Sequence, residues 1–125
     1  MSRVLVVDDE ATIRTLIGAH LKQMGHRVVT ASSAEEALEA VRTHGPPEVA
    51  VLDVVLPDIV GFDLADDLRT QPGCEQLPII FLSAKVDDQD IDRGRRLGAV
   101  YLTKPYIRSA LCNAVEKAIA VSDGW

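Results

Sequence analysis

Three acids, a hydroxyl and an amine follow short apolar runs in this 125-residue sequence. These residues are Asp8 and Asp9, Asp53, Ser83 and Lys104, and the runs before them cover 4–7, 49–52, 79–82 and 100–102. An apolar run without alternation indicates a strand buried on both faces, as in a parallel sheet. Because ligands bind at the carboxyl ends of such strands, we expect these five side chains to meet at one edge of one sheet.

The carboxylates of Asp8, Asp9 and Asp53 would repel one another at that edge. Two unit charges about 4 Å apart repel by about 4 kcal/mol at an effective dielectric constant of 20. Such a cluster needs a cation or shared protons. Hard oxygen ligands favour Mg²⁺, or the similar Mn²⁺, and Mg²⁺ usually also binds a phosphate group. The acids therefore indicate a divalent cation and phosphoryl chemistry.

Lys104 and Ser83 would complement this chemistry, since a lysine pairs with phosphate and a hydroxyl donates to a phosphoryl oxygen. The sequence contains neither of the familiar glycine-rich nucleotide-binding patterns, so no nucleotide site is indicated. A carboxylate nucleophile is the remaining option, and its product is an aspartyl phosphate. Asp53 is the candidate, because it ends the most interior strand and precedes a loop that contains Pro57.

Each of these residues also has a plain structural interpretation when it is taken alone. Asp8 and Asp9 precede a helix and could cap it, Ser83 could cap a helix or form a turn, and Lys104 could be a solvated surface residue. Their common position at strand ends favours the functional interpretation. We interpret three scattered histidines as structural or surface residues with no metal role: His20, His26 and His44.

Strands and helices alternate along the chain, which predicts one doubly wound α/β domain with five parallel strands and five helices. Besides the runs above, we expect a strand at 27–31 and helices at 11–24, from the Ser33 cap to Gly45, after Gly61, at 87–97 and at 107–121. The apolar faces expected to point inward include Leu16 and Ile107. The helix at 87–97 has few large apolar residues and Gly94 in its interior, so we expect it to be weakly anchored.

Length and composition fit one domain at 1–121, followed by a tail or linker stub at 122–125. The net charge of −6 argues against nucleic-acid binding by this domain itself, because phosphate neutralisation needs a basic face. No apolar run approaches the ~20 residues that cross a bilayer, and signal-peptide features are absent. We therefore expect a cytoplasmic domain without membrane contact. Cys74 and Cys112 are predicted to be free thiols.

This layout resembles the receiver domain of two-component response regulators, from Val4 to about Ala120. The matching residues are Asp8-Asp9, Asp53 with Pro57 four residues on, Gly61, Ser83-Ala84 and Lys104-Pro105. The resemblance implies a flavodoxin-like fold with strand order 2-1-3-4-5, whose switch point lies between the first and third strands. It also implies a phosphorylation-controlled switch, not a dedicated enzyme, with self-phosphorylation and autodephosphorylation as its only activities.

The resemblance assigns roles to the acids. By position, Asp53 resembles the phosphoacceptor, whose donor is a histidine kinase or a histidine phosphotransfer protein. Asp9 resembles the direct Mg²⁺ ligand and Asp8 a ligand that binds through water. Asp53 itself and the backbone carbonyl of Val55 complete the implied ligand set.

It also assigns roles to the residues that respond to phosphorylation. Lys104 resembles the lysine that pairs with the phosphoryl group, and its bond to Pro105 is expected to be cis. Ser83 and Tyr101 resemble the switch pair, in which the hydroxyl moves to the phosphoryl group and the ring turns inward. The region formed by the strand at 79–82, the helix at 87–97 and the strand at 100–102 is then expected to shift its population between two conformations, mainly at the helix, and so to change the face that includes the helix at 107–121.

Two residues depart from the family pattern and flank the expected path of the attacking water. Val55 stands where many relatives have a polar residue, and it cannot orient a water by hydrogen bonding. Lys85, two residues after Ser83, could pair with the phosphoryl group. We hypothesise that the phosphorylated state of this domain decays slowly.

Two other function classes remain open at this point. A Mg²⁺-dependent phosphohydrolase with an aspartyl intermediate would usually use an acid two residues after its nucleophile, where this chain has Val55. A phosphorylation-independent interaction module would not need the complete set of site residues. The output partner or effector domain is not indicated. Many relatives dimerise through the face formed by 87–97, 100–102 and 107–121, so a homodimer through this face is a further expectation.

Overall fold

A computed structural model describes residues 2–84 and 87–122 of the chain, with side chains to residue 120 apart from that gap. Five parallel strands form one sheet in the order β2-β1-β3-β4-β5, as predicted. The strands are β1 Arg3–Val7, β2 Arg27–Ala31, β3 Val49–Leu52, β4 Ile79–Ser83 and β5 Val100–Thr103. The helices are α1 Ala11–Gln23, α2 Ala34–His44, α3 Gly61–Arg69, α4 Asp88–Arg96 and α5 Arg108–Ser122.

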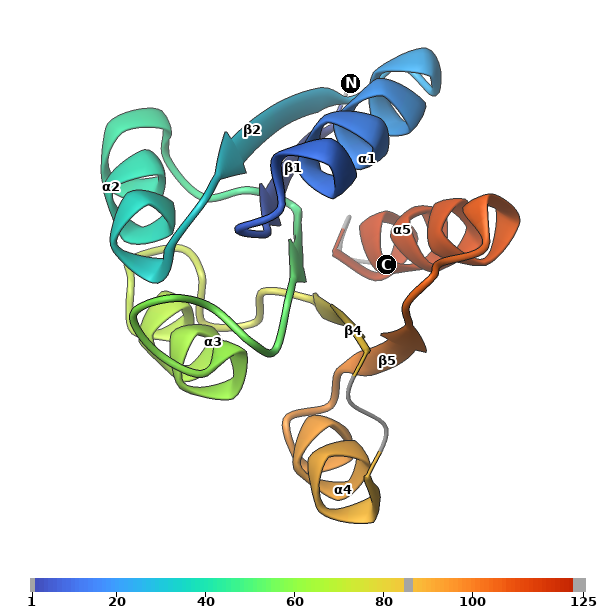
Figure 1. Cartoon of the computed structure of the whole chain (residues 1–125). Coiled ribbons are helices and arrows are strands. Elements are labelled where there is room, and N and C mark those ends of the chain that lie inside the picture. Colours follow the sequence, from blue (N-terminus) through green and yellow to red (C-terminus); the bar gives the residue numbers. More distant parts are fainter. Residues whose placement is uncertain (1, 85–86, 123–125) are drawn as a thin grey trace.

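Helices cover both faces of this sheet, which is why its interior strands are apolar throughout (Figure 1). Helices α1 and α5 lie on one face, and α2, α3 and α4 lie on the other. Every residue of β3 and β4 is buried. Their alternating side chains enter two separate core clusters, one on each side of the sheet.

Two side chains that were expected in the core are exposed, and those expectations were wrong. Leu16 is 44% exposed and Ile107 is 69% exposed. In α1 the buried line runs through Ile17 and Leu21, and a neighbouring position is rotated about 100° away from it. Ile107 precedes the first residue of α5, so it does not continue the line of buried side chains that this helix presents to the sheet.

Helix α2 begins at the predicted Ser33 cap, but the Glu36 side chain does not complete the reciprocal capping box that a Ser-x-x-Glu sequence allows. The Ser33 hydroxyl accepts a hydrogen bond from the Glu36 backbone N–H at 3.2 Å. The Glu36 carboxylate, however, accepts from the backbone N–H and hydroxyl of Ser32 instead of the N–H of Ser33. A side-chain acceptor at the first turn satisfies donors that the helix leaves unpaired.

Helix α4 has one buried residue, Gly94, which agrees with the predicted weak anchoring. A Cβ atom at Gly94 would lie 3.2 Å from the Tyr101 ring, so glycine permits a close approach of α4 to β5. Arg93, in the last turn of α4, donates to the Asp63 carboxylate of α3. Its guanidinium also lies 5.1 Å from the centre of the Phe62 ring. A glycine contact and an arginine therefore attach α4 to the domain.

Candidate functional site

Backbone pairing brings the chemistry-bearing strand ends together. Val7 and Leu52 are partners in the β1–β3 register, and the Asp53 N–H donates to the Val7 carbonyl at 2.9 Å. The Lys104 N–H likewise donates to the Ser83 carbonyl at 2.9 Å. Residues that are distant in sequence therefore project from one edge of the sheet, as the parallel pattern predicts.

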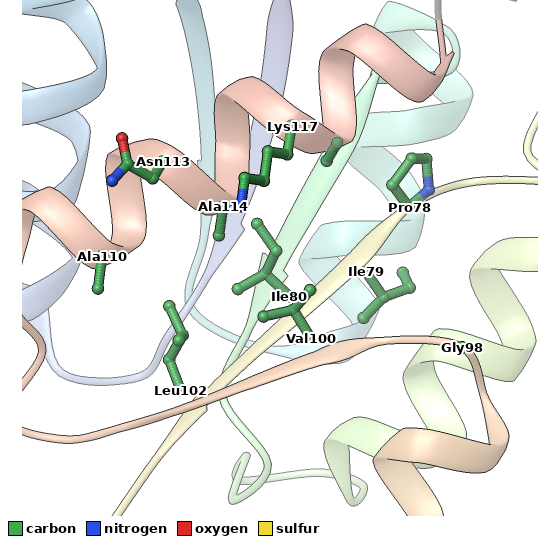
Figure 2. A pocket seen from close by; sticks show the side chains of 11 residues that line it. Pro78, Ile79, Ile80, Gly98, Val100, Leu102, Ala110, Asn113, Ala114 and Lys117 are labelled. Carbon is green, nitrogen blue, oxygen red and sulfur yellow. The ribbon is translucent and has the colours of Figure 1, made fainter.

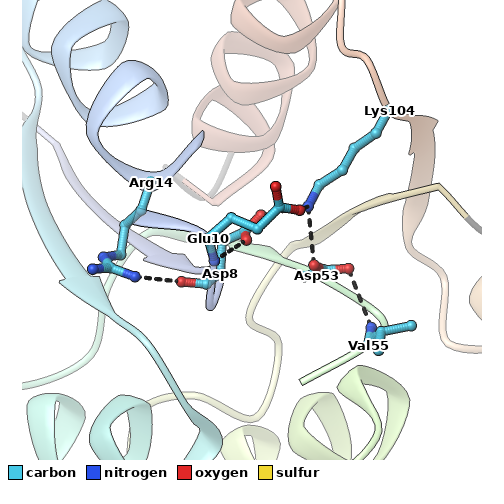
Figure 3. Close-up of polar contacts among 6 residues, drawn as sticks. All are labelled: Asp8, Glu10, Arg14, Asp53, Val55 and Lys104. Carbon is cyan, nitrogen blue, oxygen red and sulfur yellow. Dashed lines mark hydrogen bonds and ion pairs between the residues drawn. The ribbon is translucent and has the colours of Figure 1, made fainter. Parts of the chain in front are cut away.

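The Lys104 ammonium lies among three carboxylates (Figure 3). Its Nζ atom is 2.8 Å from Asp8 Oδ2, 3.0 Å from Asp53 Oδ2 and 3.2 Å from Glu10 Oε1. Burial by itself lowers the pKa of Lys104, but the hydrogen bonds and charges of Asp8 and Asp53 outweigh it and raise the pKa. Lys104 therefore supplies the cation that the crowded acids require.

Asp53 follows the last residue of β3 and is almost completely buried. Its side chain is 6% exposed, its Oδ2 accepts from Lys104, and its Oδ1 accepts from the Val55 backbone N–H at 3.1 Å. Burial raises the pKa of the Asp53 carboxyl, and the bonds from Lys104 and the Val55 N–H oppose that increase only in part. The surroundings therefore disfavour an isolated charge on Asp53.

Asp8 does not act as the helix cap that its sequence position allows. Its Oδ1 accepts from the Glu10 N–H at 2.9 Å, and its backbone carbonyl accepts from Arg14 Nη1 at 2.8 Å (Figure 3). Glu10, not Asp8, is the residue that flanks the start of α1. The second carboxylate oxygen of Asp8 is free to face Lys104.

Sequence reasoning missed Glu10. The oxygens of Asp8, Glu10 and Asp53 lie within 4.8 Å of one another, whereas Asp9, the expected direct ligand, is exposed and outside this group. The available signal was the position of Glu10, directly after the aspartate pair. Three carboxylates form a donor set of hard oxygens, which fits a cation of the Mg²⁺ type.

A cavity of about 260 Å³ opens above these residues. Most of the site residues predicted from the sequence line this cavity, and Asp8 is buried beside it. The lining residues are Asp9, Glu10, Asp53, Val55, Ser83, Ala84 and Lys104. Asp9 thus faces the same space as the three carboxylates. Lys85, which was predicted to influence dephosphorylation, lies outside the described residues. The Lys104–Pro105 peptide bond is cis, as the resemblance implies.

Ser83 and Tyr101, the expected switch pair, interact directly. Ser83 is 1% exposed at the end of β4, and its side chain is hydrogen-bonded to the partly buried Tyr101. Burial and then the Asp90 carboxylate raise the pKa of the Tyr101 phenol, and the Ser83 bond acts in the opposite direction. Ser83, which lines the cavity, is therefore linked to Tyr101, whose ring lies against Gly94 of α4.

The loop at 54–60 closes over the base of Asp53 and depends on Gly61. The Gly61 N–H donates to the Val54 carbonyl at 2.7 Å, and Val55 and Val60 form an antiparallel bridge. A Cβ atom at Gly61 would lie 2.1 Å from the Asp53 carbonyl oxygen and 2.9 Å from Val54 Cα. Both neighbours are backbone atoms, so they cannot move aside as a flexible side chain would.

Gly61→Ala should lower the free energy of unfolding by about 3 kcal/mol, because the methyl group would displace the backbone that carries Asp53. Gly18→Ala is the matched control: its Cβ would meet only Val28 at 3.8 Å, and alanine favours a helix by about 1 kcal/mol. Urea denaturation of both variants measures the difference. Equal stabilities for the two variants would contradict the packing argument.

A second cavity, of about 430 Å³, lies between β5 and α5 (Figure 2). Ile80, Val100, Leu102 and Ala114 point into it, with Lys117 above. Pro78 and Gly98, at its other end, precede β4 and β5, so this cavity extends away from Asp53. Its lining is mostly apolar and contains no carboxylate that could accept a phosphoryl group.

A family model described as the response regulator receiver domain matches residues 4–116. The chain belongs to this family. As a receiver domain of response regulators, it is a signalling switch and not a classical enzyme. The receiver fold accounts for the order of the strands and for the position of the acidic cavity at the switch point between β1 and β3.

Related receivers occur in longer proteins. The chain is 42% identical over 118 residues to the alkaline phosphatase synthesis transcriptional regulatory protein PhoP of Bacillus subtilis, covering 94% of the chain and 48% of that protein. It is 42% identical to the transcriptional regulatory protein AfsQ1 of Streptomyces coelicolor, covering 84% of the chain and 45% of that protein. The chain thus spans about half the length of these curated relatives.

Solved receivers share the whole fold. The chemotaxis protein CheY4 of Vibrio cholerae superimposes with a TM-score of 0.87 at 28% identity, covering 94% of this chain and 98% of that one. The receiver domain of the Francisella response regulator 1452 superimposes with a TM-score of 0.87 at 29% identity, covering 98% of this chain and 99% of that one.

None of the helices in the part of the receiver that the structure describes is long and apolar enough to span a membrane.

Proposed function

We propose that this receiver accepts a phosphoryl group on Asp53 from a histidine kinase or a histidine phosphotransfer protein. An Asp53 carboxylate oxygen attacks the phosphorus of the donor phosphohistidine. The new O–P bond forms as the N–P bond breaks, and the electron pair of the broken N–P bond stays on the imidazole nitrogen. The observation that supports this proposal most is the 3.0 Å contact between Asp53 and Lys104, both of which line the cavity. A carboxylate beside a cation suited to phosphoryl oxygens is the arrangement that this transfer needs.

Asp8, Asp9, Asp53 and the Val55 carbonyl are proposed to hold a Mg²⁺ or Mn²⁺ ion, with Glu10 as an additional carboxylate that the fold brings within reach. When bound, the ion supplies positive charge that offsets repulsion between the acids and an incoming phosphoryl group. Lys104 adds a second positive charge from the β5 side. The acids position the ion, and Asp53 alone forms the covalent bond.

Incubation with acetyl phosphate and Mg²⁺ tests this function. We expect intact-mass spectrometry to detect one added phosphoryl group, and chelation of Mg²⁺ by EDTA to prevent the addition. Acetyl phosphate bypasses the unknown kinase, so the result reports on the receiver itself. No added mass with Mg²⁺ present would favour a phosphorylation-independent interaction module.

Ser83 and Tyr101 are proposed to carry the response from the cavity to α4. A phosphoryl oxygen on Asp53 would compete with Tyr101 for the Ser83 hydroxyl, because both are hydrogen-bonding partners of one side chain. Helix α4 buries only Gly94, so a change at Tyr101 shifts it at low cost. The α4-β5-α5 face would then bind an output partner or a second copy of the chain. Size-exclusion chromatography with and without beryllofluoride tests the second alternative.

Val55→Asn should accelerate loss of the phosphoryl group by about fivefold, the equivalent of one hydrogen bond of about 1 kcal/mol. Val55 is 55% exposed at the cavity rim, where an amide could orient an attacking water and the native isopropyl group cannot. Decay of the phosphorylated protein, followed by intact mass after removal of the donor, measures the rate. The exposed Val60→Asn variant is the control, and an unchanged decay rate in Val55→Asn would contradict the hypothesis.

A further inference from the structure

Asp58 holds the outer end of the loop at 54–60. Its Oδ1 accepts hydrogen bonds from the backbone N–H groups of Ala34 at 3.0 Å and Ile59 at 3.2 Å. Its Oδ2 accepts from the Glu35 N–H at 2.9 Å. One carboxylate thus connects the loop that follows Asp53 to the first turn of α2, more than twenty positions earlier in the chain.

The start of α2 has two separate side-chain acceptors, and only one of them belongs to the site loop. Ser33 accepts from the Glu36 N–H and is local to the helix. Asp58 accepts from Ala34 and Glu35 and comes from the loop. Burial by itself raises the pKa of Asp58, but its backbone donors lower it, so the carboxylate is charged where the helix dipole favours a negative charge.

The inner end of the loop is fixed by different contacts. The Gly61–Val54 hydrogen bond and the Val55–Val60 bridge close its base. Leu56 and Ile59 pack against the core, so the loop keeps an apolar attachment without Asp58. The loop is therefore closed and packed without Asp58, and the bonds of Asp58 fix the orientation of the loop tip relative to α2.

We propose that Asp58 is a positioning residue for the cation site, which it serves by holding the Val55 carbonyl in place through its bonds to α2. This inference rests on the proposed function, in which Val55 is a metal ligand. Val55 belongs to the closed base, and Asp58, three residues further on, anchors the tip to α2. Release of the tip removes the contact that fixes the direction of the segment after Val55, and with it the direction of the Val55 carbonyl. Groups that orient metal ligands typically change metal affinity by 10–100-fold when they are removed.

Isothermal titration calorimetry with Mg²⁺ alone tests this role on the whole chain, at a temperature where every variant is folded. Asp58→Ala should weaken Mg²⁺ binding by roughly 10-fold. Asp58→Asn should fall between Asp58→Ala and wild type, because an amide oxygen can still accept from Ala34 and Ile59. Ser33→Ala should lower the melting temperature as Asp58→Ala does and leave Mg²⁺ affinity unchanged.

The possible results separate this inference from the proposed function. Failure of the wild-type chain to bind Mg²⁺ overturns both. Normal binding by wild type and by Asp58→Ala overturns the role of Asp58 alone. Equal weakening in Asp58→Ala and Asp58→Asn would show that charge, not hydrogen bonding, is responsible. Equal weakening in Ser33→Ala would show that Asp58 acts only through the stability of α2.

Discussion

Asp53→Asn should reduce phosphoryl incorporation from acetyl phosphate by more than about 100-fold, because an amide oxygen is a poor nucleophile and cannot form the acyl phosphate. The substitution is nearly isosteric, and the single amide oxygen can still accept one of the two hydrogen bonds that the carboxylate accepts, from the Val55 N–H or from Lys104. Intact-mass spectrometry with Mg²⁺ measures the incorporation. Peptide mapping of the wild-type protein should place the added mass on the peptide that contains Asp53.

Asp66→Asn is the matched control for this experiment. Asp66 is exposed on α3, so its substitution changes the net charge equally without touching the cavity. Wild-type incorporation in Asp66→Asn and loss in Asp53→Asn would assign the phosphoacceptor. Retained incorporation in Asp53→Asn would show that another carboxylate accepts the phosphoryl group.

Asp53→Asn should also raise the free energy of unfolding at neutral pH in the absence of a divalent cation. The pKa of Asp53 is raised in the folded protein above its usual 3.8, so folding favours the protonated carboxyl. This contribution to stability is present below the usual pKa and is lost as the pH rises through the folded pKa. An asparagine is neutral throughout that range. Urea denaturation at pH 7 with EDTA should therefore show a more stable variant.

Lys104→Met should have the opposite effect on stability. The substitution removes the cation that contacts Asp8, Asp53 and Glu10, and breaking a buried ion pair by deleting one partner costs about 3 kcal/mol. Methionine fills a similar volume, so the loss reports mainly on charge. We expect a lower urea midpoint in EDTA and slower phosphoryl incorporation, since Lys104 is proposed to pair with the phosphoryl oxygens.

Mg²⁺ should compensate more strongly in Lys104→Met than in wild type. The ammonium and a divalent cation neutralise the same carboxylates, so removal of Lys104 removes a competitor and leaves the acids in greater need of a cation. Lys117→Met, an exposed position on α5, is the control and should match wild type with and without Mg²⁺. A Mg²⁺ response in Lys104→Met no larger than that of wild type would contradict this electrostatic account.

The pattern of apolar runs was enough to predict the sheet and its chemistry-bearing edge. A short run such as 49–52 has no polar face, which indicates a strand covered on both sides, and the parallel strands of one sheet end at the same edge. The sequence pattern therefore groups Asp53, Ser83 and Lys104 at one edge of the sheet. The strand order came from the resemblance, because periodicity does not say which strands are neighbours.

Tertiary structure decided the features that depend on orientation and on contacts distant in sequence. Glu10 joins the carboxylates and Asp9 stays outside them because of how the chain turns after β1, which residue types do not reveal. Leu16 and Ile107 are exposed because a shift of one residue or a late helix start rotates a side chain away from the sheet. In the sequence, Asp58 has the position of an ordinary turn residue. Its bonds to Ala34 and Glu35 form only when α2 and the loop pack together. The sequence by itself determined which chemical groups lie at the sheet edge, since strand direction is a local property. Only the fold decided which of them touch, because contact depends on side-chain rotation and on elements that meet across the core.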